Sequence, residues 1–506
     1  MTASLKHSAV RLCAPISIAA GAVVLRLLSG VGFVNYDTLY ALAWGGQLAR
    51  GQTPAYGVAI APTPHPLVEI LGVVLRPLSA NAIEQVTVVL AFLALSACTW
   101  VIYRLGAAWF GRAAGALAGL IFITRVPVLE YGVRAYVDVP YLLLVLSALL
   151  LESGAQQRRG RAAGWPVLAL LALAGLLRPE AWAFSGLYWL YLIGLTPSWA
   201  RRSLRERSPQ RRQLADPTLG TSRGLIMLTL LAAAAPLVWI VSDLAITGQP
   251  LWSLTNTRHT ASTLGRETGI AKVPEYIPRR IGEILRPPVL LGAAVGGVLS
   301  LLWLRRRALL GAATGVAAVV VLAAFASLGL PIDTRYAFLI AAILCVFCGA
   351  GVFGWTRLEP SDPRRRWWMA GGGVVVLALI AYTPAQYHSA HRVMDKLARQ
   401  QSIEGDLVAL VENGSVTLRC GPVGVPNHAP IPLLALYLET SPRNIVNAQL
   451  PSGQISRGIY VDPASKEVED DYVLDPKDPH IAVSVPPGFS ESASNGSWLI
   501  FKRCTG

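Results

Sequence analysis

The chain has 506 residues, of which 53% are hydrophobic and only 14% are charged. Soluble globular domains carry about a quarter charged residues, so this composition excludes a chain that is solvated on all sides. Long apolar runs separated by short basic stretches are typical of a multi-pass helical membrane protein. The net charge of +15 would suggest nucleic-acid binding in a soluble protein, so its distribution along the chain decides its meaning.

Apolar segments of roughly membrane-spanning length predict about eleven transmembrane helices, although the third to fifth are short for a hydrocarbon core of about 30 Å. The expected spans are residues 10–30, 83–105, 112–126, 136–152, 162–178, 180–196, 224–247, 287–304, 308–330, 335–356 and 367–385.

Lys and Arg concentrate in every second connection between these spans. They begin with Lys6 and Arg11, are densest in the connection 197–223, and end with the run Arg364–Arg366 before the last span. Basic loops stay cytoplasmic, which predicts a cytoplasmic N-terminus and a C-terminus outside. The excess charge is therefore a topology signal, and we expect membrane lipids and no nucleic acid as partners.

Hydrophobic runs stop at about residue 386. Segments such as 415–418 and 498–501 are β-prone and are separated by Pro, Gly, Asn and Asp. We expect a membrane all-α domain over residues 1–385 and a small α/β extracytoplasmic domain over residues 386–506. Cys420 and Cys504 are the only cysteines in this tail, and they predict a disulfide formed in an oxidising compartment.

The loop 31–82 is one of two long outer loops, the other being 248–286. Apolar residues at helical spacing over 39–50, and again over 67–78 after Pro64-His65-Pro66, predict two interfacial helices. Asp37 stands at the start of the first helix, where the helix dipole favours a carboxylate. The plain alternative for Asp37 is an N-cap.

Polar side chains collect at the outer ends of the predicted helices. Glu130, Arg134 and Asp138 recur at intervals of four, which predicts acid, base and acid on one helical face. Any one such residue is explained as a snorkelling or paired interface residue, but their concentration on one leaflet indicates a site. The other members are Glu69, His65, Arg178, Glu180, Arg258, His259, Arg335 and Tyr336.

This arrangement suits a donor whose lipid tail lies in the bilayer and whose phosphate lies at headgroup depth. Arginines there would hold the phosphate and stabilise it as a leaving group, and a carboxylate would take a proton from an attacking hydroxyl. A sugar donor of this kind requires no nucleotide-binding domain, and no Walker motif or nucleotide-binding glycine fingerprint stands in a fitting context.

Short strings then give a resemblance to a known group. Residues 35–40 (NYDTLY) and 48–56 (LARGQTPAY) resemble the first outer loop of the polytopic GT-C glycosyltransferases, which include protein mannosyltransferases and aminoarabinose transferases. YVDVP at 136–140, LRPE at 177–180 and DTRY at 333–336 resemble further strings of that superfamily. Many members have two adjacent acids where this chain has Asp37-Thr38, which leaves a divalent metal doubtful, and we expect no required cofactor and no metal ligands.

The resemblance implies transfer of a sugar, with inversion, from a polyprenyl-phosphate donor to a glycan, lipid or protein acceptor. Asp37 would be the general base, and Asp138, at the second acidic position of the catalytic site, would support or position the acceptor together with Glu69. Arg178, Arg258 and Arg335 would bind the donor phosphate, with His65 and His259 in support. We expect a bacterial plasma-membrane protein whose active site faces outside.

Two alternatives stay open. A lipid-linked glycan transporter or flippase would need polar residues through the cytoplasmic half of the spans, where few are found. A non-catalytic envelope scaffold would predict that Asp37 is dispensable.

Overall fold

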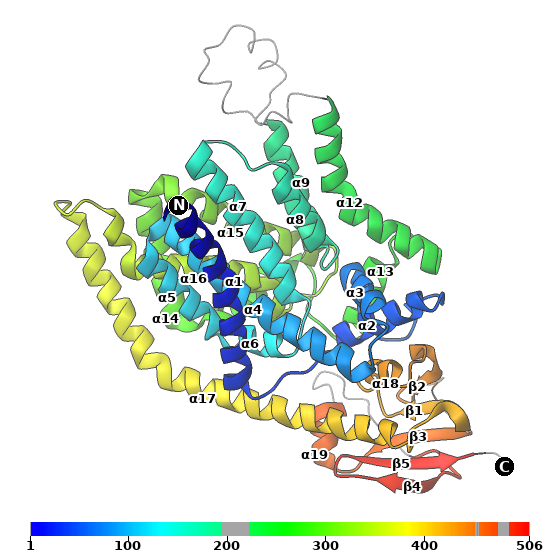
Figure 1. Cartoon of the computed structure of the whole chain (residues 1–506). Coiled ribbons are helices and arrows are strands. Elements are labelled where there is room, and N and C mark those ends of the chain that lie inside the picture. Colours follow the sequence, from blue (N-terminus) through cyan, green and yellow to red (C-terminus); the bar gives the residue numbers. More distant parts are fainter. Residues whose placement is uncertain (1, 195–221, 451–452, 454, 474–484, 505–506) are drawn as a thin grey trace.

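The computed structural model describes residues 2–194, 222–450, 453, 455–473 and 485–504. It consists of a helical bundle and a small C-terminal sheet that lies at one end of the bundle (Figure 1). The most basic part of the connection 197–223, which supports the predicted orientation, lies largely outside the described residues.

Seven helical segments of the described chain are long and apolar enough to cross a membrane, and the bent pair α5 (Arg112–Ile123) and α6 (Val126–Val133) adds an eighth. These seven coincide with predicted spans and include α4 (Ala80–Phe110), α7 (Asp138–Arg159), α12 (Ser222–Thr247), α14 (Val273–Trp303), α15 (Arg305–Ser327), η3 with α16 (Thr334–Ala337, Phe338–Phe353) and α17 (Arg364–Glu412).

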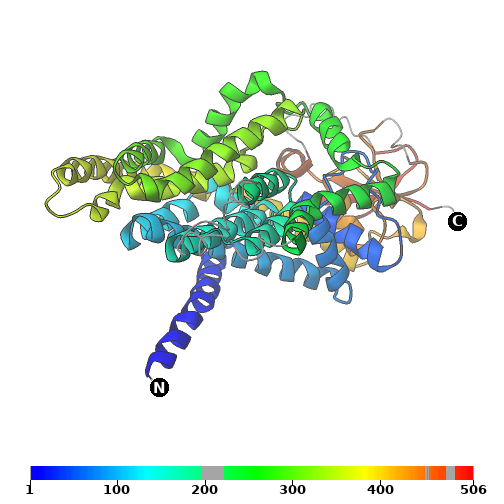
Figure 2. The ribbon, with the colours of Figure 1, turned by 90° about the horizontal axis from the view of Figure 1, so that it is seen from above.

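Three further predicted spans coincide with α1 (Thr2–Ser29), α8 (Trp165–Gly175) and α9 (Glu180–Gly194). The apolar part of α1 is Ala14–Ser29, and α8 and α9 have 11 and 15 residues. A multi-pass membrane fold is therefore confirmed, while the number eleven and the orientation stay predictions. At its N-terminal end α1 projects away from the bundle (Figure 2).

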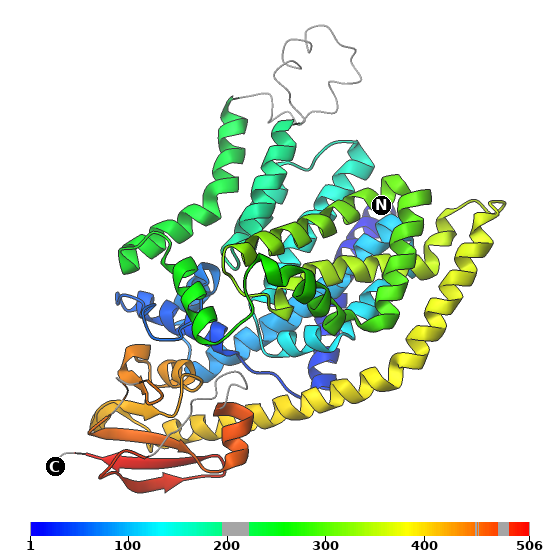
Figure 3. The same cartoon turned by 180° about the vertical axis from the view of Figure 1, so that it is seen from behind.

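The centre of the bundle is α16, which is buried along nearly its whole length. It packs against α14 so closely that a Cβ on Gly296 would overlap the carbonyl oxygen of Phe347. Small residues let helix backbones approach in this way in membrane proteins, where packing replaces the hydrophobic effect between helices. These helices lie together in the view from behind (Figure 3).

Two helix breaks meet beside this centre. The axis bends by 64° between α5 and α6, and α14 is interrupted at Arg286, whose φ is 63°. The buried side chain of Arg125 lies at the first break and donates to the carbonyls of Ile121 and Leu285 at 3.0 and 3.3 Å. Arg125 thus donates to backbone carbonyl oxygens close to both breaks. Without such a donor, burying these carbonyl oxygens would be costly.

Both helices expected in the first long loop are present, as α2 (Tyr36–Ala49) and α3 (Pro66–Leu75). The first one is buried by protein over the whole stretch from Thr38 to Gly45, and its place at the membrane interface stays a prediction. It packs against α3 on one side and the C-terminal domain on the other. Gly45 and Gly72 form the α2–α3 contact, where a Cβ on Gly45 would overlap the carbonyl oxygen of Glu69.

The helix α17 links the bundle to the tail, passing without a break through the predicted boundary at residue 385. The tail folds into one sheet of order β2-β1-β3-β5-β4, with β1 parallel to β2 and β3, and β5 antiparallel to β3 and β4. Its elements are β1 (Val423–Val425), α18 (Ile431–Tyr437), β2 (Ile445–Asn447), β3 (Gly458–Pro463), α19 (Lys466–Val468), β4 (Ser490–Ser494) and β5 (Trp498–Arg503). In the bundle, the second long loop contains the helix α13 (Trp252–Thr263).

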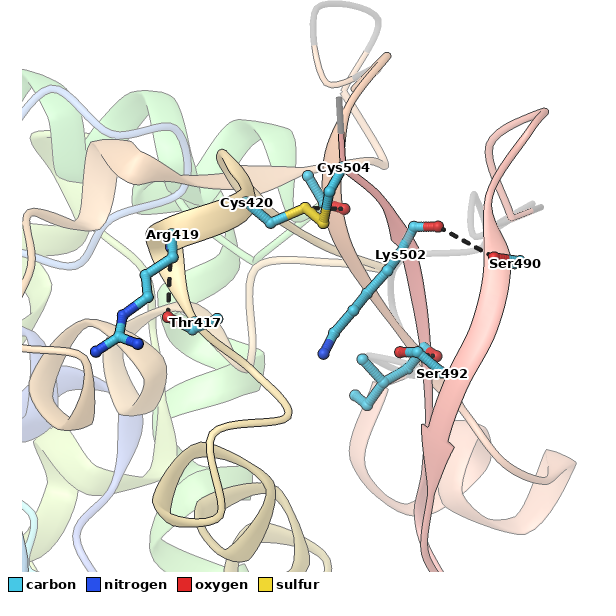
Figure 4. The surroundings of a disulfide bond; sticks show 9 residues. Thr417, Arg419, Cys420, Ser490, Ser492, Lys502 and Cys504 are labelled. Atoms are coloured by element: carbon cyan, nitrogen blue, oxygen red, sulfur yellow. Dashed lines mark hydrogen bonds between the residues drawn. A yellow bond between two sulfur atoms is a disulfide. The ribbon is translucent and has the colours of Figure 1, made fainter. Parts of the chain in front are cut away.

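The predicted disulfide is present. Cys420 and Cys504 are bonded, with their Cα atoms 5.2 Å apart. The bond ties the segment before β1 to the end of β5, beside the Ser490–Lys502 contact between β4 and β5 (Figure 4). A cross-link over a sequence separation of 84 residues restricts the unfolded chain and so favours the folded sheet.

The close α2–α3 contact gives a first prediction. Gly45→Ala should lower the thermal midpoint of the purified protein in detergent, because the added methyl group pushes backbone against backbone, at a cost of about 1–3 kcal/mol. Gly46→Ala on the same helix is the control, since its Cβ would meet only the end of the Arg50 side chain, at 3.5 Å. Equal midpoints for the two variants would contradict the packing described.

Candidate active site

The first turn of α2 places Asp37 without using it as a cap. The N-cap is Asn35, whose Oδ1 accepts from the backbone N–H groups of Asp37 and Thr38 at 2.8 and 3.3 Å. The amide of Asn35 also donates to the carbonyl of Arg134 at 3.0 Å, which ties this helix start to the turn before α7. The N-cap alternative for Asp37 is therefore wrong, and its carboxylate is available for another role.

The carboxylate of Asp37 is bound by an arginine that lies near the C-terminal end of the bundle in sequence. Nη1 of Arg335, in η3, donates to Oδ2 of Asp37 at 2.6 Å across a sequence separation of 298 residues. The same Nη1 lies 3.8 Å from Oδ2 of Asp138 at the start of α7. Both Asp37 and Arg335 are mostly shielded, with side chains 16% and 14% exposed.

Arg178 is bound on the other side of Asp138. Its Nη1 pairs with Oδ1 of Asp138, and its Nη2 and Nε form a fork on the two oxygens of Glu180, at 2.7 and 3.2 Å. The guanidinium carbon lies 4.2 Å from the centre of the Tyr336 ring, in a cation–π contact. The five residues Asp37, Asp138, Arg178, Glu180 and Arg335 form one chain of contacts, called the ion-pair cluster below.

The electrostatics of this cluster affect its neighbours. Burial raises the pKa of Asp37, but the Arg335 guanidinium outweighs this and holds the pKa below its usual range. Burial lowers the pKa of His65 to about 4, so its ring is neutral at pH 7. Nδ1 of His65 donates to the carbonyl of Leu177 at 2.7 Å, which leaves Nε2 able to accept a hydrogen bond.

A cavity of about 130 Å³ opens beside the cluster. Its polar wall carries Asp37, His65, Arg178, Glu180, Arg335 and Tyr336. Apolar side chains of the lining, called the apolar wall below, come from α13 and the residue after it and from α15, namely Leu254, Ala261, Leu264, Leu322 and Phe325. The two long loops meet at its edge, where the hydroxyls of Thr63 and Thr257 are 2.5 Å apart.

Six predicted site residues do not line this cavity. Asp138 is buried behind Arg178. Glu69 is buried on α3, where both its oxygens contact the hydroxyl of Tyr56 at 2.9 and 2.7 Å, and burial raises its pKa to about 7. The pair Glu130 and Arg134 are 3.4 Å apart on and after α6, and Arg258 and His259 are exposed on α13.

Three cavity residues with ionisable side chains were not predicted as site residues. Arg266 lines the cavity and pairs with Asp333 at 3.2 Å, and its position in the second long loop was a usable signal. Tyr36 immediately precedes Asp37 and lies within a string already noted. His428 comes from the C-terminal domain, and no local pattern in the tail singles it out.

The described residues contain no group of three or more His, Cys, Asp or Glu side chains that could hold a metal ion. The expectation that no metal is required stays a prediction.

Comparison with solved structures identifies the fold. The chain is similar to ArnT from Cupriavidus metallidurans bound to undecaprenyl phosphate, with a TM-score of 0.53 and 14% identity over 96% of this chain and 97% of that one. ArnT belongs to the GT-C superfamily, so the GT-C-like fold predicted from the sequence is confirmed. No protein-family model matches the chain, and no curated protein matches it in sequence.

Weaker similarities involve the oligosaccharyltransferase of Archaeoglobus fulgidus. AglB in complex with an inhibitory peptide and a dolichol-phosphate has a TM-score of 0.45 and 13% identity over 86% of this chain, which spans 64% of that chain. The apo form has a TM-score of 0.49 and 11% identity, over 90% of this chain and 69% of that one.

The buried neutral His65 gives a second prediction. Its pKa is about 4 in the folded protein against about 6.5 when exposed, so the unfolded chain gains a proton that the folded chain does not. This difference lowers stability as pH falls from 6.5 towards 4, by an amount on the order of 3 kcal/mol. His65→Asn should therefore flatten the fall in thermal midpoint between pH 7 and pH 4.5.

The exposed His391 provides the matched control, since His391→Asn should leave the pH profile of the thermal midpoint unchanged. A His65→Asn profile that is as steep as that of the unmodified protein would contradict the buried neutral imidazole.

Proposed function

We propose that this protein is an integral-membrane glycosyltransferase that moves a sugar from a polyprenyl-phosphate donor to an acceptor hydroxyl, with inversion. One observation carries the proposal: one cavity is lined by two carboxylates, three arginines and an apolar wall. Such a cavity suits a ligand with an anionic head and a hydrocarbon chain. The ArnT structure of similar fold is bound to undecaprenyl phosphate, which supports the same donor class here.

Arg335 and Arg266 are the best candidates for binding the donor phosphate. Both line the cavity. Arg335 pairs most closely with Asp37, at 2.6 Å, with Asp138 farther away at 3.8 Å, and Arg266 pairs with Asp333 at 3.2 Å. When the bond between the anomeric carbon and the phosphate oxygen breaks, its electron pair passes to that oxygen, and guanidinium groups stabilise the charge that develops. The apolar side chains of α13 and α15 would accommodate the start of the lipid chain.

Arg178 has a different role in this proposal. Its guanidinium is already bound by Asp138 and by the two oxygens of Glu180. It therefore contributes a fixed positive charge to the cavity, and its N–H groups are not proposed to bind the donor phosphate directly. Asp138 acts by positioning Arg178 and Arg335, which refines its expected catalytic role. Arg258 is exposed on α13 outside the cavity lining and is a weaker candidate for the phosphate than Arg266.

Asp37 is proposed as the general base that takes the proton of the acceptor hydroxyl. While Arg335 binds it, its lowered pKa makes it a weak base. A donor phosphate that draws Arg335 towards itself would remove the main cause of this lowering, so the basicity of Asp37 would rise when donor is bound. The base is then strongest when both substrates are present.

We further propose that the C-terminal domain and the cavity face the outside of a bacterial plasma membrane. The disulfide between Cys420 and Cys504 supports an oxidising compartment for the tail, and the basic connections support the opposite side for the cytoplasm. In this proposal residues 1–385 form the catalytic domain and residues 386–506 the extracytoplasmic one.

The role of Asp37 gives a third prediction. Asp37→Asn should abolish sugar transfer when the purified protein is incubated with a panel of undecaprenyl-phosphate sugars and a membrane extract as acceptor source. It should keep or strengthen the binding of undecaprenyl phosphate, because Arg335 loses an internal anionic partner. Asp395→Asn, at an exposed position on α17, is the control.

Normal transfer by Asp37→Asn would remove the base assignment. Movement of a lipid-linked glycan across vesicles without consumption of donor would favour the transporter, and full function in cells without Asp37 would favour the scaffold.

Arg335 gives a fourth prediction. Arg335→Ala should weaken the binding of undecaprenyl phosphate about 10- to 100-fold, the range expected for hydrogen bonds to a charged group. Titration in detergent or nanodiscs measures this directly. Arg279→Ala, which removes an arginine that is 59% exposed, should leave the affinity unchanged, and equal affinities for the two variants would contradict the role of Arg335.

A further inference from the structure

The C-terminal sheet has a topological switch point. The chain runs from β1 through α18 to β2 on one side, and then to β3 on the other side of β1, giving the parallel order β2-β1-β3. In open α/β sheets, ligands bind outside the carboxyl ends of the parallel strands at the point where the strand order reverses. Three of the five strands of this mixed sheet, β2, β1 and β3, are parallel. The segment that directly follows the central strand β1 is residues 426–430.

This segment is held rigidly. Asn427 is 1% exposed. Its Oδ1 accepts from the N–H of Ala429 at 2.9 Å, and its Nδ2 donates to the carbonyl of Val473. The neighbouring residue, His428, is therefore fixed at the carboxyl end of β1.

His428 reaches the proposed active site. It lines the same cavity as Asp37, and its ring lies edge-on to Tyr36 with the ring centres 5.4 Å apart. Tyr36 directly precedes Asp37 on α2. The C-terminal domain thus contributes a hydrogen-bonding side chain beside the residue proposed as the base.

Several contacts fix the domain in this position. The hydroxyl of Tyr437 bonds Glu84 on α4, Nε2 of Gln47 on α2 donates to Ser441 at 3.2 Å, and Arg76 pairs with Glu439 at 3.3 Å. The helix α18 packs on α2, as the ribbon also shows (Figure 1). The cavity wall carrying His428 is therefore part of the docked structure.

We infer that the C-terminal domain forms the acceptor subsite and that His428 positions the acceptor hydroxyl for Asp37; this rests on the proposed function. With Arg335, Arg266 and the apolar wall assigned to the donor, Tyr36 and His428 in the same cavity are assigned to the second substrate. The acceptor O–H gives its proton to Asp37, its oxygen bonds the anomeric carbon, and the phosphate leaves with the electron pair of the broken bond. The imidazole of His428 hydrogen-bonds the same hydroxyl or its neighbour.

The test separates acceptor from donor. The full-length protein in nanodiscs receives a labelled undecaprenyl-phosphate sugar that the unmodified protein consumes, and a membrane extract is titrated as acceptor source. His428→Ala should raise the half-saturating amount of extract about 5- to 10-fold, as expected for one lost hydrogen bond. The affinity for undecaprenyl phosphate, measured separately, should stay unchanged.

Two further variants distinguish hydrogen bonding from packing. His428→Gln keeps a polar group, so its half-saturating amount of extract should lie between those of the unmodified protein and His428→Ala. His428→Phe keeps only an aromatic ring and should behave like His428→Ala. His391→Ala, at an exposed position on α17, is the control for the loss of a histidine.

Each other outcome overturns the inference. An unchanged half-saturating amount of extract, or a Phe variant equal to the unmodified protein, leaves His428 as packing only. Weaker binding of undecaprenyl phosphate by His428→Ala would put His428 on the donor side. If the unmodified protein consumes none of the donors, the proposed function fails, and this inference fails with it.

Discussion

The buried ion-pair cluster is the constraint on which the rest of the structure depends. Removing charged groups from water costs several kcal/mol for each ion unless partners compensate, so Arg178 and Arg335 can be buried only where carboxylates meet them. Those carboxylates come from α2, from the start of α7 and from the start of α9. Segments distant in sequence must therefore converge at one end of the bundle.

The surrounding elements hold these segments in place. Asn35 caps α2 and is bonded to the turn before α7, while His65 is bonded to the turn that carries Arg178. The glycine contact between α2 and α3 sets the distance between the two halves of the first loop. The C-terminal domain then covers α2, so the same helix supports both the proposed base and the wall bearing His428.

The cluster is also suited to an exchange of partners. Its arginines are paired with internal carboxylates, and in the proposed function an incoming phosphate would compete with these carboxylates for the arginines. Arg335 is the natural point of exchange, because one of its nitrogens lies near two carboxylates. Arg178, bound on three sides by Asp138, Glu180 and Tyr336, would hold the rest of the cluster in register.

Much of the architecture follows from the sequence alone, because apolar run length, basic loops and helical spacing are local properties. They predicted the apolar helices of the bundle, the helices α2 and α3, the strand at 498–501, which is part of β5, and the pairing of the two tail cysteines. The β-prone segment 415–418 is not a strand, so that prediction is wrong. The superfamily strings also pointed to Asp37, Arg178 and Arg335, which the structure brings together. The pairing of Asp37 with Arg335 spans 298 residues and that of Arg178 with Asp138 spans 40, so neither is encoded in a local pattern.

Only the tertiary structure decided which polar residues belong to the cavity. Helical spacing near a membrane surface could not separate Glu69, which turns to Tyr56, from Asp37, which turns to Arg335. Nor could it place His428 in the cavity, because that position arises from the docking of the C-terminal domain, through α18, on α2. The sequence by itself determined which segments are apolar, basic or β-prone, since these are short-range properties; the pairing of buried charges, which depends on packing between distant segments, was decided by the fold.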